Sequence, residues 1–208
     1  LANVSNTGAF EVYATGSNLN VKAENIYVGD NETIIVTVEG EYDENVTLVI
    51  GDLTYESPLV YNSTSNNSVA TFKLDYKFPA GTYTAHASFI SEDAGRIVTH
   101  EGRDSFIVSK INSTVGINSI SDIKVSENVT VTFTLAPSDA TGTIDVYVNG
   151  ERHIVNADNL TLTLTGLAAG HYFVQAMYGG DNKYLPSSAN ATFEVYKNNI
   201  SITLDVVS

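Results

Sequence analysis

Residues 167–197, LAAGHYFVQAMYGGDNKYLPSSANATFEVYK, decide the fold class of this chain. Alternate residues from Tyr172 to Tyr178 are apolar, which is the pattern of a half-buried β-strand. The segment GGDNK then interrupts the pattern, because Gly and Asn tolerate positive φ angles and Asp and Asn side chains bond to nearby backbone. The alternation resumes with Phe193 and Val195 on one side. The stretch therefore predicts two β-strands joined by a turn-rich loop.

The composition extends this prediction to the whole chain. The 208 residues are rich in Tyr, Val, Ile, Thr and Phe, which favour pleated, half-buried strands. No window of about 11 residues has apolar positions at helical spacing. The predicted fold class is therefore all-β.

Pieces of the opening stretch recur elsewhere, which indicates an internal repeat. The motif FEVY of residues 193–196 also stands at residues 10–13, and a looser copy stands at residues 106–110. The motif AGHY at residues 169–172 matches AGTY at residues 80–83. Because the copies keep one order along the chain, we infer a repeat of about 90–100 residues, the size of one β-sandwich domain.

We expect residues 18–110 and 111–197 to form two tandem Ig-like Greek-key β-sandwich domains. Residues 1–17 are expected to hold the last strand of a preceding repeat and a linker, and residues 198–208 the first strand of a following repeat. The chain begins at Leu1 without a signal segment, so we interpret it as an internal fragment of a longer protein. The segments that connect the repeats are short and contain no Pro- or Gly-rich linker. We therefore expect neighbouring Ig-like repeats of the same chain to be partners of each other and closely coupled.

The turns and strands of the repeats follow from the same patterns. Asn149-Gly150 is expected to form a type I′ hairpin turn, with Gly51-Asp52 in its place in the first repeat. Tyr83 and Tyr172 each follow a Gly by two residues, where a tyrosine corner would lie. The strands of the second repeat are expected near residues 113–120, 127–135, 143–148, 151–155, 160–164, 171–178 and 190–196.

The first repeat should differ from the second between its last two strands. There we expect residues 90–104 to form a longer loop, which carries Arg96, His100 and Arg103.

The charge and the residue types exclude several classes of function. The formal net charge is −14 and the few Lys and Arg residues are not clustered, so nucleic acid is not an expected partner. The acidity is typical of a soluble, self-repelling surface, and divalent cation binding is the alternative. The chain has no Cys, which excludes disulfides and thiolate sites. The chain contains no apolar run of about 18 residues, so membrane insertion is not expected.

The sequence contains no motif for catalysis, so we expect no catalytic residues and no enzyme activity. The four histidines are scattered, and no Gly-x-Ser-x-Gly elbow or His-Glu-x-x-His motif occurs. Acidic turns at residues 43–45, at Glu92-Asp93 and at Asp181-Asn182 could offer oxygen ligands to Ca²⁺. None has the spacing of a dedicated loop, so solvated turns are preferred and no cofactor or metal site is predicted.

Half of the asparagines lie in Asn-x-Ser/Thr sequons, which are candidate glycosylation sites. A Thr- and Asn-rich β-protein is the alternative explanation. The candidates are Asn3, Asn31, Asn45, Asn62, Asn66, Asn112, Asn128, Asn159, Asn190 and Asn199.

Four segments of the second repeat carry a family resemblance. They are DIKVSENVT at residues 122–130, DATGT at 139–143, LAAGHY at 167–172 and YGGDNKYLPS at 178–187. In this order they resemble the bacterial Ig-like (type 3) repeats of adhesin-like cell-surface proteins, especially those of archaeal methanogens. The resemblance covers residues 111–197 and is partial in the first repeat. It implies an extracellular stalk or adhesion module at the cell surface and provides no catalytic residues.

The second repeat also carries a candidate partner-binding patch. Phe173 and Met177 share the outward face of one predicted strand, and Tyr147 and Tyr196 have outward parity on strands expected to flank it. The first repeat has Thr84, His86 and Ser88 on the corresponding strand. The patch is expected either to pack against a neighbouring loop or domain, or to contact a partner or stack on a glycan.

We therefore expect a non-enzymatic, adhesin-like repeat module that projects or forms an adhesive region. Its expected partners are the surface of another cell or the glycans and proteins of that surface. Two alternatives remain open: a carbohydrate-binding module of a secreted enzyme, and a purely structural S-layer or stalk spacer.

Overall fold

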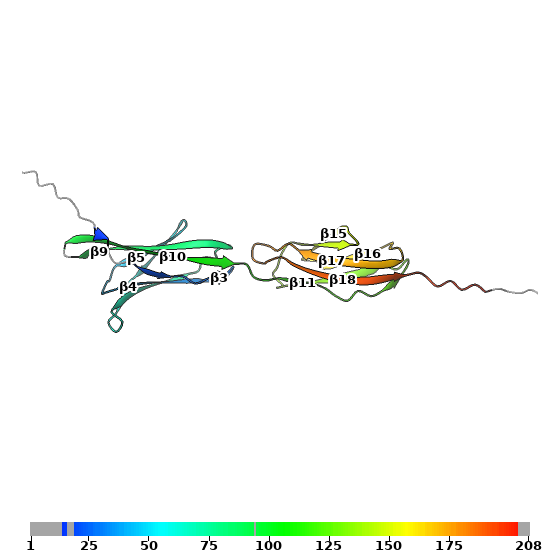
Figure 1. The fold of residues 1–208 in the computed structure, drawn as a ribbon, viewed down its shortest axis with the longest axis horizontal. Helices are drawn as coiled ribbons and strands as arrows, with labels where there is room; N and C mark the ends of the chain where they lie inside the picture. The colour runs from blue at the N-terminus through cyan, green and yellow to red at the C-terminus, as the bar shows by residue number, and fades with distance from the viewer. Residues whose placement is uncertain (1–13, 16–18, 94, 204–208) are drawn as a thin grey trace, which may run out of the picture. The chain divides into compact units, whose positions relative to one another are not determined.

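The computed structural model describes residues 14–15, 19–93 and 95–203, and it confirms the all-β fold class (Figure 1). No helix occurs among these residues. The chain divides into two compact units, which we call unit 1 (residues 1–109) and unit 2 (residues 110–208). Each unit is a sandwich of two β-sheets around its own apolar core.

Unit 2 packs a five-stranded sheet on a three-stranded sheet. The larger sheet has the order β12 (Ile123–Lys124), β18 (Ser187–Tyr196), β17 (Gly170–Tyr178), β14 (Thr143–Val148) and β15 (Glu151–Asn156). The smaller has the order β11 (Thr114–Ile117), β13 (Val129–Ala136) and β16 (Thr161–Leu164). Every predicted strand of this repeat overlaps an observed one. The short β12, which pairs parallel to β18, was not predicted.

Unit 1 has the same plan with longer strands. One sheet has the order β1 (Ala14–Thr15), β10 (Arg96–Ser109), β9 (Gly81–Asp93), β5 (Asn45–Ile50) and β6 (Leu53–Pro58), and β3 (Ile26–Tyr27) also pairs with β10. The other has the order β2 (Asn20–Lys22), β4 (Glu32–Glu39), β8 (Asn67–Leu74) and β7 (Val60–Asn62).

The cores are built from the residues that alternate inward. In unit 2, Val131, Ile144, Val146 and Val174 are fully buried, and Tyr178 is among the largest buried side chains. In unit 1 the corresponding layer includes Ile34, Leu48, Ala87 and Phe106 (all 0% exposed). Burying such side chains contributes roughly 1.5–3 kcal/mol each, which fixes the register of each strand.

Both predicted hairpins and both tyrosine corners are observed, and the type I′ turn is confirmed at Asn149-Gly150. Asn149 and Gly150 have φ angles of 48° and 91°, as a type I′ turn requires. Gly51 has a φ angle of 58° at the first central position of its hairpin. The Tyr83 hydroxyl donates to the Pro79 carbonyl (2.9 Å) and the Tyr172 hydroxyl to the Ala168 carbonyl (3.1 Å). Each phenol thus anchors the turn before its strand.

The long loop predicted at residues 90–104 is wrong. β9 and β10 continue through it as paired strands and run side by side in Figure 1. The inward positions there are occupied by Ser91 and His100, whose Oγ and Nε2 atoms lie 2.9 Å apart in a buried contact. The His100 ring also stacks on Phe89, with ring centroids 4.4 Å apart. Two polar side chains thus occupy core positions, and the apolar alternation that would have identified these strands is missing.

The outer edge of β10 is covered by the chain that enters unit 1. Ala14 and Thr15 pair with Val98 and Thr99, and the Leu19 amide donates to the Glu101 carbonyl (3.0 Å). A Cβ atom on Gly102 would lie 2.2 Å from the Leu19 carbonyl oxygen. A glycine is therefore needed where the backbones cross.

Parts of the predicted flanking strands lie outside the described residues. The FEVY motif at residues 10–13 is among these, as are residues 204–208. Residues 197–203 form no strand. Their proposed pairing with further repeats stays a prediction.

Candidate functional site

The outer face of the β17 sheet in unit 2 brings together three of the four predicted patch residues. Phe173 and Met177 lie on β17 and are 43% and 45% exposed. Tyr147 on β14 is half-buried and pairs with Gln175, the residue between them on this face. Tyr147 is therefore a diagonal neighbour of Phe173 and of Met177, and diagonal neighbours, about 7–8 Å apart, are within reach of aromatic and long side chains.

Tyr196 is not part of this cluster. It is 54% exposed on β18 and shares the face, but it pairs with Lys124 at the far end of the strand. Phe173 pairs with Thr192, so four residues, or about 13 Å, separate Tyr196 from that row. The His171–Glu194 contact (2.8 Å) lies between. The Tyr196 hydroxyl donates to Asp122 (3.3 Å) instead.

Sequence reasoning missed Ile154, which extends the face onto β15. Its side chain is 58% exposed. Asp145 stands between Ile154 and Met177 in the same cross-strand row. The Arg152 guanidinium contacts that carboxylate at 2.6 Å, and the pairing raises the pKa of Arg152. The apolar face is therefore divided by one ion pair.

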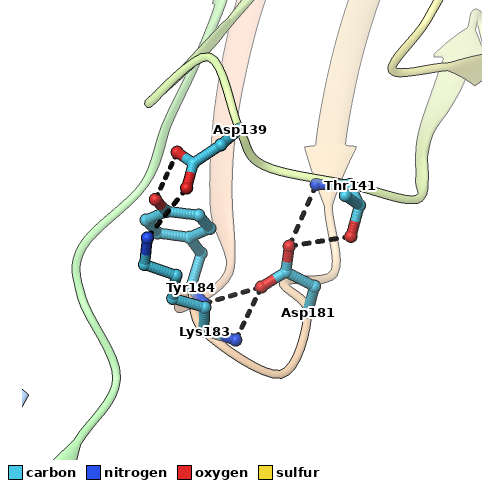
Figure 2. A network of polar contacts seen from close by, with 5 residues as sticks. All are labelled: Asp139, Thr141, Asp181, Lys183 and Tyr184. Carbon is cyan, nitrogen blue, oxygen red and sulfur yellow. Dashed lines mark hydrogen bonds and ion pairs between the residues drawn. The ribbon is translucent and has the colours of Figure 1, made fainter. Parts of the chain in front are cut away.

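A second site is a polar network that ties two loops of unit 2 together (Figure 2). Both carboxylate oxygens of Asp181 are used. Oδ2 accepts from the Thr141 amide (2.9 Å) and hydroxyl (3.0 Å). Oδ1 accepts from the amides of Lys183 (2.8 Å) and Tyr184 (2.7 Å). With four donors on one carboxylate, Asp181 has no free lone pair for a cation in this arrangement.

Asp139 holds the other end of the network. Its carboxylate accepts from the Tyr184 hydroxyl and forms an ion pair with the Lys183 ammonium (2.8 Å). Figure 2 shows Asp139 bonded to the side-chain ends of Lys183 and Tyr184, and Asp181 bonded to the backbone amides of the same two residues. The Lys110 ammonium donates to the Asp181 carbonyl, so the residue that enters unit 2 joins the same network.

The network shifts the ionisation of its members. Burial alone would raise the pKa of Asp181, but the hydrogen bonds from Thr141, Lys183 and Tyr184 outweigh it and hold that pKa well below its usual range. The ion pair with Asp139 raises the pKa of Lys183. Burial, together with the nearby Asp181 carboxylate, raises the pKa of Tyr178 to about 12. Near neutral pH Asp181 is therefore ionised, Lys183 is protonated and Tyr178 is neutral.

This arrangement gives a structural reason for the YGGDNKY segment. Gly180 has a φ angle of 80°, and a Cβ atom there would lie 2.7 Å from the Tyr184 carbonyl oxygen. The Tyr178 hydroxyl donates to the Thr141 carbonyl (2.9 Å). The residues act as loop anchors. The sequence predicted a turn in which the Asp and Asn side chains bond to nearby backbone, with cation binding as the alternative, but it did not predict the bonds from Thr141 to Asp181.

The sequon asparagines that the structure describes are all solvent-exposed. Asn3 lies outside the described residues. Exposure alone does not single them out, since asparagines outside sequons such as Asn20 and Asn118 are exposed as well. The exposed sequon residues are Asn31, Asn45, Asn62, Asn66, Asn112, Asn128, Asn159, Asn190 and Asn199.

One buried carboxylate lies in unit 1. Glu32 is 1% exposed, its Oε1 accepts from the Glu24 amide (3.1 Å), and its Oε2 has no hydrogen-bond partner among the described residues. Burial raises the pKa of Glu32. Among the residues with described positions, no group of three or more His, Cys, Asp or Glu side chains could hold a metal ion.

The histidines show no catalytic arrangement in the described part of the chain. His100 is buried beside Ser91, not placed in a loop as predicted, and is closed off from solvent. His86 lies 3.4 Å from Glu101, and His153 lies on β15.

Comparison with known protein families finds a match within unit 2. Residues 117–196 match the family described as bacterial Ig-like domain (group 3). This match agrees with the resemblance seen in the sequence, while the archaeal adhesin context is not part of it. Unit 2 thus has an Ig-like domain of a kind typically found in extracellular, non-enzymatic modules, and no catalytic family is indicated. No curated protein matches the chain.

Several solved structures share weak similarity with the chain. The fibronectin(III)-like modules of Clostridium thermocellum CbhA are 16% identical, with 91% of this chain and 100% of that chain covered and a TM-score of 0.39. The mouse nectin-like molecule 4 ectodomain (Ig1–Ig3) is 13% identical, with 89% and 66% covered and a TM-score of 0.34. The chain spans about a third of red sea bream transglutaminase (88% and 32% covered, 11% identical, TM-score 0.42). Similarities at this level assign no function.

No helix among the described residues is long and apolar enough to cross a membrane.

Proposed function

We propose that this chain is a non-enzymatic, extracellular module of an adhesin-like cell-surface protein, which projects or forms an adhesive region. The observation that carries this proposal is how each unit binds the chain that enters it. Ala14 and Thr15 pair with β10 of unit 1. In unit 2 the Ile111 amide donates to the Lys183 carbonyl (2.9 Å), and the Leu185 amide donates to the Ile111 carbonyl (2.8 Å).

These contacts suit a spacer because they leave little free chain between repeats. β10 ends at Ser109 and Ile111 is already bridged to Tyr184, so Lys110 alone lies between the two paired segments. A short linker limits the length of free chain between two repeats, whereas a long flexible linker is less suited to a projecting stalk. The net charge of −14 further opposes association between neighbouring molecules on a crowded surface.

The cellular part of the proposal is tested on intact cells of the organism that makes the chain. Antibodies raised against the 208-residue chain should label unpermeabilised cells, and protease added outside should remove the signal. A cytosolic marker protein serves as the control and should resist the protease. Signal that appears only after permeabilisation would disprove the extracellular placement.

The adhesive part is tested with beads coated with the chain. We expect the beads to be retained on cells or on their isolated surface polymers. If the outer face of unit 2 makes the contact, combining Phe173→Ala with Tyr147→Ala should abolish retention and leave the melting temperature nearly unchanged, because both side chains are partly exposed. The matched control is Val49→Ala, at the position of unit 1 that corresponds to Tyr147.

Two other functions are distinguished by the same material. A carbohydrate-binding module is favoured by the exposed aromatic ring of Phe173 and would give clear hits on a glycan array with bacterially produced, unglycosylated chain. A structural S-layer or stalk spacer would self-associate in light scattering and bind no external ligand.

A further inference from the structure

The sequon at Asn190 differs from the other described sequons in its position. Asn190 lies in the interior of β18, whereas Asn45 and Asn62 stand at strand ends and the other described sequon asparagines lie outside strands. Asn190 and Thr192 are both exposed and, two residues apart on one strand, project from the same face. Neither side chain has a hydrogen-bond partner among the described residues. The acceptor amide and the hydroxyl that a sequon requires are therefore both free.

The strand register places this sequon against the apolar patch. Asn190 pairs with Gln175, Thr192 pairs with Phe173, and Met177 pairs with Ser188. Phe173 and Met177 are thus the two diagonal neighbours of Asn190 on the same face. Diagonal neighbours lie about 7–8 Å apart, within reach of long or aromatic side chains. A sugar attached to Asn190 would begin between two exposed apolar side chains.

Unit 1 provides an internal comparison. Aligned on Tyr83 with Tyr172 and on Phe106 with Phe193, it has Thr84 and Ser88 where unit 2 has Phe173 and Met177. It has Arg103 where unit 2 has Asn190, and Arg103 is paired with His86 as Asn190 is with Gln175. The sequon and the exposed apolar side chains are therefore present together in unit 2 and absent together from unit 1.

We propose that Asn190 is an N-glycosylation site and that its glycan lies across Phe173 and Met177. This inference rests on the extracellular placement proposed above. The donor is an oligosaccharide joined through phosphate to a polyisoprenoid lipid, acted on by an oligosaccharyltransferase. The Asn190 Nδ2 atom attacks the anomeric carbon, the bond from that carbon to the phosphate oxygen breaks, the lipid phosphate leaves, and the amide nitrogen loses one proton. No oxidant or reductant is needed.

The face around Asn190 matches the chemistry of a sugar. A pyranose ring has an apolar face of C–H groups, which an aromatic ring can cover, and a rim of hydroxyls. Phe173 and Met177 provide the apolar surface, while Gln175, Ser188 and Thr192 provide polar groups around it. Apolar contact with a few polar groups at the edge is the usual composition of a small-ligand site. The chain's own glycan is then the occupant of the patch.

The modification is tested by secreting the full chain from a eukaryotic host that performs N-glycosylation. Glycopeptide mapping should find Asn190 occupied, and Thr192→Ala should abolish occupancy at that site only. Asn159→Gln is the matched control, because it removes an exposed sequon in a turn of the same unit. An empty Asn190 would overturn the proposal, whether the other sequons are occupied or not.

The position of the glycan is tested through Met177, which is the only methionine in the chain. Oxidation of the chain's methionine by dilute peroxide therefore reports on this side chain alone. A glycan lying on the patch should slow the oxidation by about threefold or more relative to Asn190→Gln, because oxidation follows exposure. Asn159→Gln should oxidise at the wild-type rate. Equal rates for wild type and Asn190→Gln would show that the glycan extends into solvent and would overturn the placement.

The unglycosylated chain tests other occupants of the same face. Phe173→Thr combined with Met177→Ser gives the patch the residues of unit 1. If the unglycosylated chain binds free saccharides or dimerises, and this double variant does neither, the patch is an open binding face and the proposal is wrong. Failure of the proposed function would be detected separately, because the antibodies would then not label intact, unpermeabilised cells.

Discussion

The carboxylate of Asp181 accepts two hydrogen bonds from Thr141, at 2.9 Å from its amide and 3.0 Å from its hydroxyl, across 40 residues of sequence. The same side chain caps the amides of Lys183 and Tyr184 in its own loop. One carboxylate thus satisfies four donors and fixes two loops at the same end of unit 2.

Removing this carboxylate should destabilise unit 2. We expect Asp181→Ala to lower the free energy of unfolding of this unit by about 2–4 kcal/mol, since hydrogen bonds to a charged group contribute more than neutral ones and their donors would lose their partner. Urea unfolding monitored by a probe in unit 2 measures the effect. Asn182→Ala, at the next and exposed position, is the control and should change stability by less than about 0.5 kcal/mol. Equal effects of the two substitutions would contradict the role of Asp181.

Asp181 should also make unit 2 sensitive to acid. Its folded-state pKa lies below the unfolded value of about 3.9, so the folded unit binds fewer protons between these two values. The stabilisation is complete above about pH 5 and is lost as the pH falls through the lowered folded pKa. The stability difference between wild type and Asp181→Asn should therefore be largest near pH 7 and should shrink below about pH 4. A difference that stays constant down to pH 2 would refute this linkage.

Glu32 should have the opposite pH signature in unit 1. Burial raises its pKa, so the folded unit binds more protons than the unfolded chain above the unfolded value of about 4.3. The contribution of Glu32 to the stability of unit 1 is fully present below that value and is lost as the pH rises through the folded pKa. Relative to Glu32→Gln, wild type should lose stability from about pH 4 towards neutral pH, by roughly 1–2 kcal/mol.

The measurement is thermal unfolding of wild type and of Glu32→Gln from about pH 4 to neutral pH. Glu56→Gln is the control, because Glu56 is exposed. A wild type that gains stability relative to Glu32→Gln as the pH rises would reverse the sign and exclude burial as the dominant effect.

Gly102 should tolerate no side chain. An added Cβ would lie 2.2 Å from the Leu19 carbonyl oxygen. Because that oxygen belongs to the backbone, the clash can be relieved only by moving the strand. We expect Gly102→Ala to cost unit 1 about 2–3 kcal/mol, as overpacking does in a core. Gly81→Ala is the matched control, because its Cβ would have its nearest contact at 3.6 Å, an ordinary van der Waals distance. Denaturant midpoints that coincide for the two variants would show that the crossing of Leu19 and β10 is not tight.

The prediction of strands succeeded where the pattern was local. The alternation from Tyr172 to Tyr178 gave β17, and Asn149-Gly150 gave the hairpin after β14. It failed at residues 90–104, where Ser91 and His100 occupy inward positions. A buried Ser–His contact is acceptable only because each side chain finds the other, and neither residue alone indicates a core position.

The candidate face was partly predictable. Outward parity placed Phe173, Met177 and Tyr147 on one face, because parity is fixed by the two-residue period of a strand. Parity gave no position along the face, so the separation of Tyr196 from the others was not foreseen. Nor was the pairing that brings Asn190 between Phe173 and Met177, since it depends on the register of β17 against β18.

The sequence by itself determined the all-β class, the position of both hairpins and the turn type at Asn149-Gly150, because strand period and turn chemistry depend on residues close together along the backbone. Only the tertiary structure decided which polar residues satisfy one another. Asp139 and Asp181 meet the Lys183-Tyr184 segment through folding of the whole of unit 2, and hydrogen bonds across some 40 residues leave no periodic trace in the sequence. The same holds for the edge of β10, where Gly102 is explained by the passage of Leu19 and by nothing in its own neighbourhood.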